Sequence, residues 1–316
     1  MSQLLDVPKV EVACLESLHR WEIIVFLSLM VPGLLSNSFI LITFIKLPRI
    51  RSLTNYFVAS LAFSDILILL TSPPLLLLIF LKKIDLKTGF VIRICCEIFC
   101  GMASLMNFAC ISVDRMIAIS KPLYHRTLSP SRSLRFIAFI WFIAFMASLL
   151  KGLLIEVFHI HISYIFLIIL FCLGFVVPTI CTVVSYSIIT RVVLRSSRDG
   201  LERNSQQDSR IRQTIRLTWK ILLVILPSST MWGCFWIVMV AQAEVSHTFN
   251  ALVNMVPVLA ATMNPIIYVV MTTEFRRHLI RLLNLGSTPN VSSPIFAGLS
   301  LQNLNSQSSL SVINRI

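Results

Sequence analysis

Charged residues stand at both ends of one apolar stretch of this sequence. Glu97 lies near its start, and Asp114 and Arg115 lie side by side near its end. A carboxylate such as Glu97 pairs with cations, and the Arg115 guanidinium has five N–H donors and no accessible neutral form, so it always needs oxygen partners. These residue types favour ligand binding and conformational control through charge pairing.

An α-helix would place these charges on one face. Glu97 and Arg115 are linked by residues that follow one another in steps of three or four: Gly101, Ser104, Phe108 and Ile111. Such spacing forms a single stripe. The 18 residues from Glu97 to Arg115 span five helical turns, or about 27 Å. The predicted helix therefore connects one polar site with a second at its other end.

The elements that position these residues are predicted to be membrane spans. With 56% hydrophobic and 13% charged residues over 316 positions, the chain has more apolar surface than a water-soluble domain buries. A span needs about 20 mostly apolar residues. Seven segments qualify: 22–45, 55–81, 91–117, 134–156, 162–193, 213–242 and 248–271. We therefore expect an all-α membrane protein, a bundle of seven transmembrane helices.

The distribution of basic residues predicts the orientation of this bundle. Of the 27 lysines and arginines, 20 fall on one side of the predicted spans. Cytoplasmic segments are enriched in these residues, so we expect an extracellular N-terminus (1–21), a cytoplasmic C-terminus and a plasma-membrane location. The net charge of +13 then reflects topology and attraction to anionic lipids. We expect no nucleic-acid binding, because the sequence offers no soluble basic domain for it.

Short motifs in these spans resemble those of one receptor family. They are Asn37 in SNS, LAFSD ending at Asp65, DRM at 114–116 followed by Pro122 and Leu123, Trp141, Pro178 with Tyr186, NPIIY at 264–268, and EFRRHL at 274–279. In this order they are similar to the rhodopsin-like (class A) G-protein-coupled receptors, over residues 22 to about 283. The resemblance implies a receptor that transmits the binding of an extracellular ligand to nucleotide exchange on a heterotrimeric G protein.

The resemblance also implies roles for individual residues. Asp114 braces Arg115 at rest, and on activation Arg115 acquires new oxygen partners, for which the family suggests Tyr186 and Tyr268. The expected coupling and switch residues are Asp114, Arg115, Pro122, Leu123, Tyr186, Asn264, Pro265 and Tyr268. The packed hinge between the outer site and this switch is expected at Leu105, Pro178 and Ile221.

Asp65 is expected near the middle of the membrane, where a carboxylate needs partners. The family pattern places Asn37, Ser104 and Asn264 around it, and these groups together suit an allosteric sodium ion. The alternative is a neutral, hydrogen-bonded Asp65 without an ion, since Ala260 stands where the family often has another polar side chain. Beyond this sodium ion we expect no cofactor.

The expected ligand site lies at the other end of the stripe. Glu97 occupies the place where amine receptors of the family carry an Asp that pairs with the ligand's ammonium. Gly101, Asn254 and Trp232 complete the expected ligand contacts. The ligand is then a small amine, or otherwise a lipid or a peptide. The alternative role for Glu97 is structural pairing with Lys151 or Arg93.

The sequence departs from the family pattern at several positions. Phe90 stands where the family has a Cys that forms a disulfide with the second extracellular loop, and residues 151–163 contain no Cys. If Pro227 is the proline of the sixth span, Ile225 replaces the family's switch Trp. The acidic residue that often locks the motif Arg is replaced by Gln207, so we expect appreciable basal activity.

Two segments follow the last predicted span. We expect residues 272–284 to form a short amphipathic eighth helix and the Ser- and Asn-rich residues 285–316 to form a disordered cytoplasmic tail. Serines of such a tail accept phosphates. The resemblance therefore implies a receptor kinase and arrestin as partners, besides the G protein, the ligand and membrane lipids.

A transporter or channel is the alternative function, because interior Asp and Glu residues also mark ion routes. Against it, the sequence has no repeat with matching broken helices, and its interior polar residues are too sparse for a continuous aqueous path. We do not expect an enzyme, since the sequence contains no metal-ligand cluster, nucleophile elbow or phosphate-binding loop.

Overall fold

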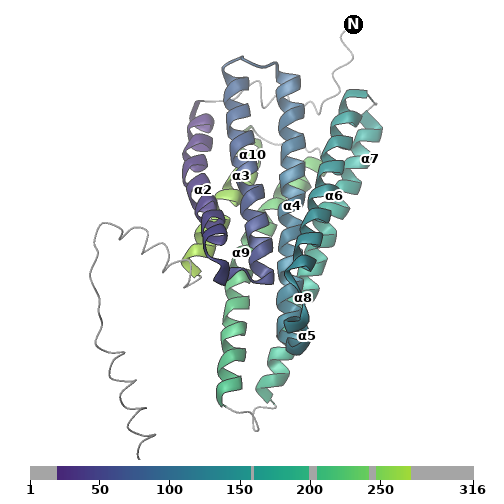
Figure 1. Ribbon diagram of the computed structural model, residues 1–316. Coiled ribbons are helices and arrows are strands. Elements are labelled where there is room, and N and C mark those ends of the chain that lie inside the picture. Colours follow the sequence, from purple (N-terminus) through teal and green to yellow (C-terminus); the bar gives the residue numbers. More distant parts are fainter. Residues whose placement is uncertain (1–19, 158–159, 199–204, 242–246, 272–316) are drawn as a thin grey trace, which may run out of the picture. The chain divides into compact units, whose positions relative to one another are not determined.

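The computed structural model is a bundle of long helices (Figure 1). It describes residues 20–157, 160–198, 205–241 and 247–271. The helices, labelled as in Figure 1, are α2 (Arg20–Lys46), α3 (Leu53–Phe80), α4 (Leu86–Ser120), α5 (Pro122–Thr127), α6 (Pro130–Val157), α7 (Ile160–Phe171), α8 (Val177–Arg198), α9 (Ser205–Ala241) and α10 (His247–Met271). A 3-10 turn, η1 (Pro48–Ile50), and a π-helical turn, η2 (Cys172–Val176), complete the described elements.

Each predicted span coincides with a helix or with a continuous helical run. Six stretches of the described chain are long and apolar enough to cross a membrane. The seventh predicted span, 248–271, is α10, whose apolar stretch Ala251–Pro265 is shorter. The fifth, 162–193, is the run of α7, η2 and α8.

The π-helical turn η2 lies directly before Pro178. A proline ring clashes with the carbonyl four residues back, and a widened turn relieves that clash, with Val177 donating its N–H to the Cys172 carbonyl. Gly174 of this turn faces α4, and a Cβ added to it would lie 2.9 Å from the Met102 side chain. The glycine therefore allows the fifth span to approach α4 closely.

α4 is the most buried span and carries the predicted stripe into the interior. It packs against α3, α6, α8 and α9, and 67% of its apolar window is buried, compared with 22–44% for the other five long spans. Every stripe residue before Arg115 is buried: Glu97, Gly101, Ser104, Phe108 and Ile111. By contrast, Phe139 and Phe142 of α6 are 60% and 62% exposed, as expected for side chains that face lipid.

The described residues all belong to one unit of the chain, Met1–Arg276. The expected extracellular residues before Arg20, the expected eighth helix (272–284) and the expected tail (285–316) lie outside the described residues. These three predictions therefore stay predictions.

Candidate functional site

A charged cluster lies at the end of α4, and we call it the Arg115 cluster: Thr54, Asp114, Arg115 and His125. Arg115 Nη2 donates to Asp114 Oδ2 at 2.7 Å, and Arg115 Nε donates to the same oxygen at 3.3 Å. The hydroxyl of Thr54 on α3 also donates to Oδ2, and Arg115 contacts Thr54 as well. His125 Nε2 on α5 lies 2.8 Å from Asp114 Oδ1. One buried carboxylate therefore joins α3, α4 and α5.

The local sequence explains how these side chains meet. Ser52 is the N-cap of α3, and its hydroxyl accepts from the Asn55 N–H at 3.3 Å, so the helix begins just before Thr54. Pro122 occupies the first position of α5, where its missing N–H has no intrahelical partner to lose. One turn later, His125 lies against Asp114.

The other predicted switch residues lie at different depths. Pro122 is exposed at the start of α5 and Leu123 is 77% exposed, so both are available to a partner. Tyr186 of α8 is buried and donates to the Thr218 carbonyl of α9 at 3.4 Å, which joins these two helices. Residue 268 is helical, but the side chain of Tyr268 lies outside the described residues.

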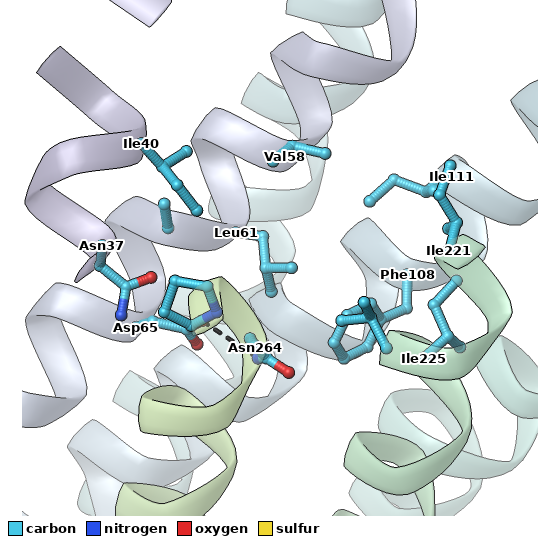
Figure 2. Close-up of a pocket in the computed structure, with 13 residues that line it drawn as sticks. Asn37, Ile40, Val58, Leu61, Asp65, Phe108, Ile111, Ile221, Ile225 and Asn264 are labelled. Atoms are coloured by element: carbon cyan, nitrogen blue, oxygen red, sulfur yellow. Dashed lines mark hydrogen bonds between the residues drawn. The ribbon is translucent and has the colours of Figure 1, made fainter. Parts of the chain in front are cut away.

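A small cavity lies beside Asp65, in the middle of the bundle (Figure 2). Asn264 Nδ2 of α10 donates to Asp65 Oδ2 at 3.1 Å, and the hydroxyl of Ser228 on α9 donates to Asn264 Oδ1. These bonds join α3, α9 and α10. Asn37 of α2 donates to the Gly33 carbonyl at 2.9 Å and the Ala261 carbonyl at 3.0 Å.

The cavity has polar groups at one end and apolar walls at the other. Its volume is about 20 Å³, which suffices for a water molecule or a small ion. Asn37, Asp65 and Asn264 from the predicted sodium site line it, and Ser104 pairs with Ser64 at 2.8 Å and also interacts with Asp65. The apolar wall comes mainly from Ile40, Val58, Leu61, Phe108, Ile111, Ile221 and Ile225. Asn37 Oδ1 is buried and has no hydrogen-bond partner.

A second charged cluster lies near the start of α4, and we call it the Arg93 cluster: Ser72, Arg93, Glu97 and Asn254. Arg93 Nε donates to Glu97 Oε1 at 2.9 Å, and the two side chains are 4% and 2% exposed. The Ser72 hydroxyl of α3 donates to the same oxygen at 3.0 Å. On α10, Asn254 Oδ1 accepts from Arg93 Nη2 at 3.1 Å. Of the two structural partners considered for Glu97, the structure has Arg93.

One turn deeper on the stripe, Gly101 and Trp232 are in direct contact. A Cβ added to Gly101 would lie 2.6 Å from the Trp232 indole, so the absent side chain makes room for the ring. Trp232 is buried and packs edge-to-face on Phe235, with 5.6 Å between ring centroids. Ile225, which stands at the sequence position of the family's switch Trp, lines the Asp65 cavity instead. The tryptophan that reaches α4 is therefore two turns farther along α9.

The predicted hinge residues lie on three helices, α4, α8 and α9. Leu105 is buried on α4, next along the chain from Ser104. Ile221 lines the Asp65 cavity with Ile111, and Pro178 follows the π-helical turn in the fifth span. In the described part of the chain all cysteines are free.

The sequence did not predict four residues that contribute to these sites: Thr54, His125, Ser72 and Ser228. Ser72 and Arg93 lie 21 residues apart in the chain, and Thr54 and Asp114 lie 60 apart. No periodicity within one helix predicts contacts between helices at such separations. His125 had a signal in the sequence, because Pro122 starts a short helix that carries it back toward Asp114.

Comparison with known proteins places these clusters in a wider context. The model of the family "7 transmembrane receptor (rhodopsin family)" matches residues 36–268. Similar proteins include the melanopsins of the lizard Podarcis siculus (26% identical over 277 residues), of the mouse (27% over 273) and of humans (26% over 275). The matches cover 77–78% of this chain but only 52–58% of those proteins.

Proposed function

Because this chain belongs to the rhodopsin family of seven-transmembrane receptors, we propose that it transmits the binding of an extracellular ligand to nucleotide exchange on a heterotrimeric G protein. The predicted fold class is confirmed: the chain is a multi-pass membrane protein built as a seven-helix bundle. The predicted membership of the rhodopsin-like receptors is confirmed as well.

The Arg115 cluster is the observation that carries this proposal. Arg115 is held by a carboxylate at 2.7 Å, and the exposed Leu123 lies on the adjacent short helix. When the bundle opens, Arg115 leaves Asp114 and offers its donors to oxygens of a bound partner. A ligand drives this change only if it binds the open state more tightly than the closed one.

The orientation follows from the basic residues. We place the Arg115 cluster at the cytoplasmic face of the plasma membrane and the Arg93 cluster toward the extracellular face, because the basic segments gather on the Arg115 side. The expected coupling surface is Arg115, Pro122, Leu123 and the basic residues between 191 and 220. Arrestin and a receptor kinase remain proposed partners of residues 285–316.

Melanopsins as relatives raise retinal as a candidate cofactor. Retinal held covalently needs an interior lysine amine. In the described part of the chain Lys151 on α6 is the only buried lysine, and its neighbour Gly152 packs on Cys95. Beside Glu97, the interior is filled by Trp232 against Gly101. These residues do not fit a covalently bound retinal.

An allosteric sodium ion at Asp65 remains part of the proposal. The unpartnered Asn37 Oδ1 and the Asp65 carboxylate border one cavity, and oxygen groups of this kind suit a hard cation. Sodium is then expected to raise the melting temperature of the purified receptor more than potassium at equal ionic strength. An equal effect of both salts, unchanged in Asp65→Asn, would favour the neutral, ion-free Asp65.

Nucleotide exchange tests the receptor function against the transporter alternative. Purified protein in lipid nanodiscs is mixed with a panel of heterotrimeric G proteins, and exchange is expected to accelerate with at least one of them. Arg115→Ala should return the rate to that without receptor, whereas Arg20→Ala, an exposed arginine at the other end of the bundle, should not. Unchanged exchange in Arg115→Ala would remove the mechanism, and solute flux without exchange would favour a transporter.

A further inference from the structure

The Arg93 cluster contains one positive and one negative charge, and both are buried. The Arg93 and Glu97 side chains are 4% and 2% exposed and lie 2.9 Å apart. Their charges cancel, so the closed site is electrically neutral. In a buried ion pair each charge compensates the other. Removing one partner leaves the other charge uncompensated, at a large free-energy cost.

Each charge also has a neutral partner on another helix. Ser72 on α3 donates to Glu97 at 3.0 Å and also accepts from Arg93 Nε at 3.4 Å, whereas Asn254 on α10 accepts from Arg93 Nη2 at 3.1 Å. If the ion pair separates, Glu97 keeps its bond to α3 and Arg93 keeps its bond to α10. The pair is thus divisible into two half-sites, each of which needs one new group of opposite charge.

A ligand with a single charge fills only one half-site. An amine that pairs with Glu97 leaves Arg93 buried and unpaired, and a carboxylate that pairs with Arg93 leaves Glu97 in the same condition. A ligand that carries both groups compensates both charges at once. Gly101 and Trp232, one turn deeper, are in direct contact and close the site below the ion pair, so the ligand has to be small.

From this arrangement we propose that the ligand is a small zwitterion of the amino-acid type, whose ammonium pairs with Glu97 and whose carboxylate pairs with Arg93. This inference rests on the proposed receptor function and specifies the chemical class of the ligand. The ligand separates Arg93 from Glu97. Its ammonium takes the place of Arg93 as the partner of Glu97, and its carboxylate takes the place of Glu97 as the partner of Arg93. The separation alters the link that the Arg93 cluster makes between α3 and α10.

Thermal stabilisation of the purified receptor in nanodiscs measures binding without a G protein, because a ligand that binds the folded state raises its melting temperature. The twenty free amino acids are screened first. The strongest binder is then compared with its methyl ester, which is only cationic, and with its N-acetyl derivative, which is only anionic. Both derivatives are expected to bind about a hundredfold more weakly or worse.

Variants that neutralise one or both charges of the cluster should change which form of the ligand binds most tightly. In Arg93→Gln the methyl ester is expected to bind better than the free amino acid, and in Glu97→Gln the N-acetyl derivative should do so. The double variant Arg93→Gln/Glu97→Gln buries no unpaired charge, so it folds even if a single variant does not, and it should prefer the N-acetyl methyl ester. Lys83→Gln, which removes an exposed charge outside the cluster, should leave the wild-type order unchanged.

Three results would overturn the proposal: a wild-type receptor that no amino acid stabilises, singly charged derivatives that bind as tightly as the zwitterion, or variants that keep the wild-type order. Nucleotide exchange is measured separately on the same preparations. Binding with the predicted charge preference but without exchange would contradict the proposed function and leave the ligand class standing. Exchange driven by a simple amine or a fatty acid would support the proposed function and contradict the zwitterionic ligand class.

Discussion

Asp114 is the residue on which the Arg115 cluster depends. Its carboxylate accepts from Arg115 and Thr54 on one oxygen and faces His125 on the other. Bonds to a charged group are stronger than neutral ones. The bond to His125 therefore fixes the short helix α5, and with it the exposed Leu123, to the end of α4.

We predict that His125→Ala loosens α5 without unfolding the bundle. The variant loses one hydrogen bond to a charged group, worth about 1.5–3 kcal/mol, and α5 is too short to hold its shape alone. Hydrogen–deuterium exchange should therefore accelerate at residues 122–127. Tyr124→Phe is the control, since it removes only the exposed contact with Arg132. Equal protection in His125→Ala and wild type would show that other contacts hold α5.

Sequence reasoning reached part of these two clusters. The adjacency of Asp114 and Arg115 indicates their ion pair, and Arg93 was one of the two structural partners considered for Glu97. Thr54 and Ser72 come from another helix, α3. Their contacts depend on how helices rotate and cross in the folded bundle, which no single-helix pattern contains.

At the scale of elements, α4 and α9 pack by fitting a large ring into the space of a missing side chain. Gly101→Ala would place a Cβ 2.6 Å from the Trp232 ring, and overpacking of this kind costs about 1–3 kcal/mol. We therefore predict a lower melting temperature for Gly101→Ala. Adding Trp232→Leu should recover part of the loss, a non-additive effect expected for residues in contact.

Gly152→Ala is the matched control, because its added Cβ would meet only the Cys95 sulfur, at 3.1 Å. The control should lower the melting temperature less than Gly101→Ala does. If Gly101→Ala is neutral, or if Trp232→Leu gives no recovery, the close contact between α4 and α9 is not limiting for stability.

The start of α4 depends on a titratable cap. Asp85 Oδ2 accepts from the Thr88 N–H at 2.8 Å, and this bond holds the pKa of Asp85 below its usual value. A lowered folded-state pKa means that the cap stabilises the protein above the unfolded-state pKa and that this contribution is lost as pH falls through the folded-state pKa. The cap therefore acts fully at neutral pH.

We predict that Asp85→Ala is less stable than wild type at neutral pH and that the difference shrinks in acid. Melting temperatures from pH 7 to pH 3 measure it. Asp85→Asn keeps an acceptor that does not titrate, so its stability relative to Asp85→Ala should vary less with pH. A wild-type advantage that persists undiminished at the lowest pH would contradict a charged cap.

The positions of the spans were predictable, but the exact limits of the helices and their local details were not. Length and apolar content predict where each span lies, because the thickness of a bilayer sets its length. They do not predict that α4 begins at Leu86 and α9 at Ser205, five and eight residues before the predicted spans. Pro178 predicts a bend in the fifth span, but not that the chain absorbs it in a π-helical turn at Cys172–Val176. The formation of the π-helical turn also depends on the close packing of Gly174 against Met102.

At the scale of the whole molecule, α4 connects two charged clusters through a hydrogen-bonded middle layer. The Arg93 cluster joins α3, α4 and α10, and the Arg115 cluster joins α3, α4 and α5. Between them, the bonds from Ser228 to Asn264 and from Asn264 to Asp65 connect α9 and α10 with α3. A movement of α10 at the Arg93 cluster therefore also affects the bond from Asn264 to Asp65, in the layer next to the Arg115 cluster.

We propose that Asp114 restrains Arg115 at rest and that the release of Arg115 permits coupling. Basal nucleotide exchange, measured at equal amounts of folded receptor, tests this claim most directly. Asp114→Asn keeps the shape of the side chain and removes its charge, which weakens the hold on Arg115 by about 1.4 kcal/mol and should raise basal exchange about tenfold. The double variant Asp114→Asn/Arg115→Ala should fall to the rate without receptor. Unchanged exchange in Asp114→Asn, or a double variant that stays as active as Asp114→Asn, would contradict the account.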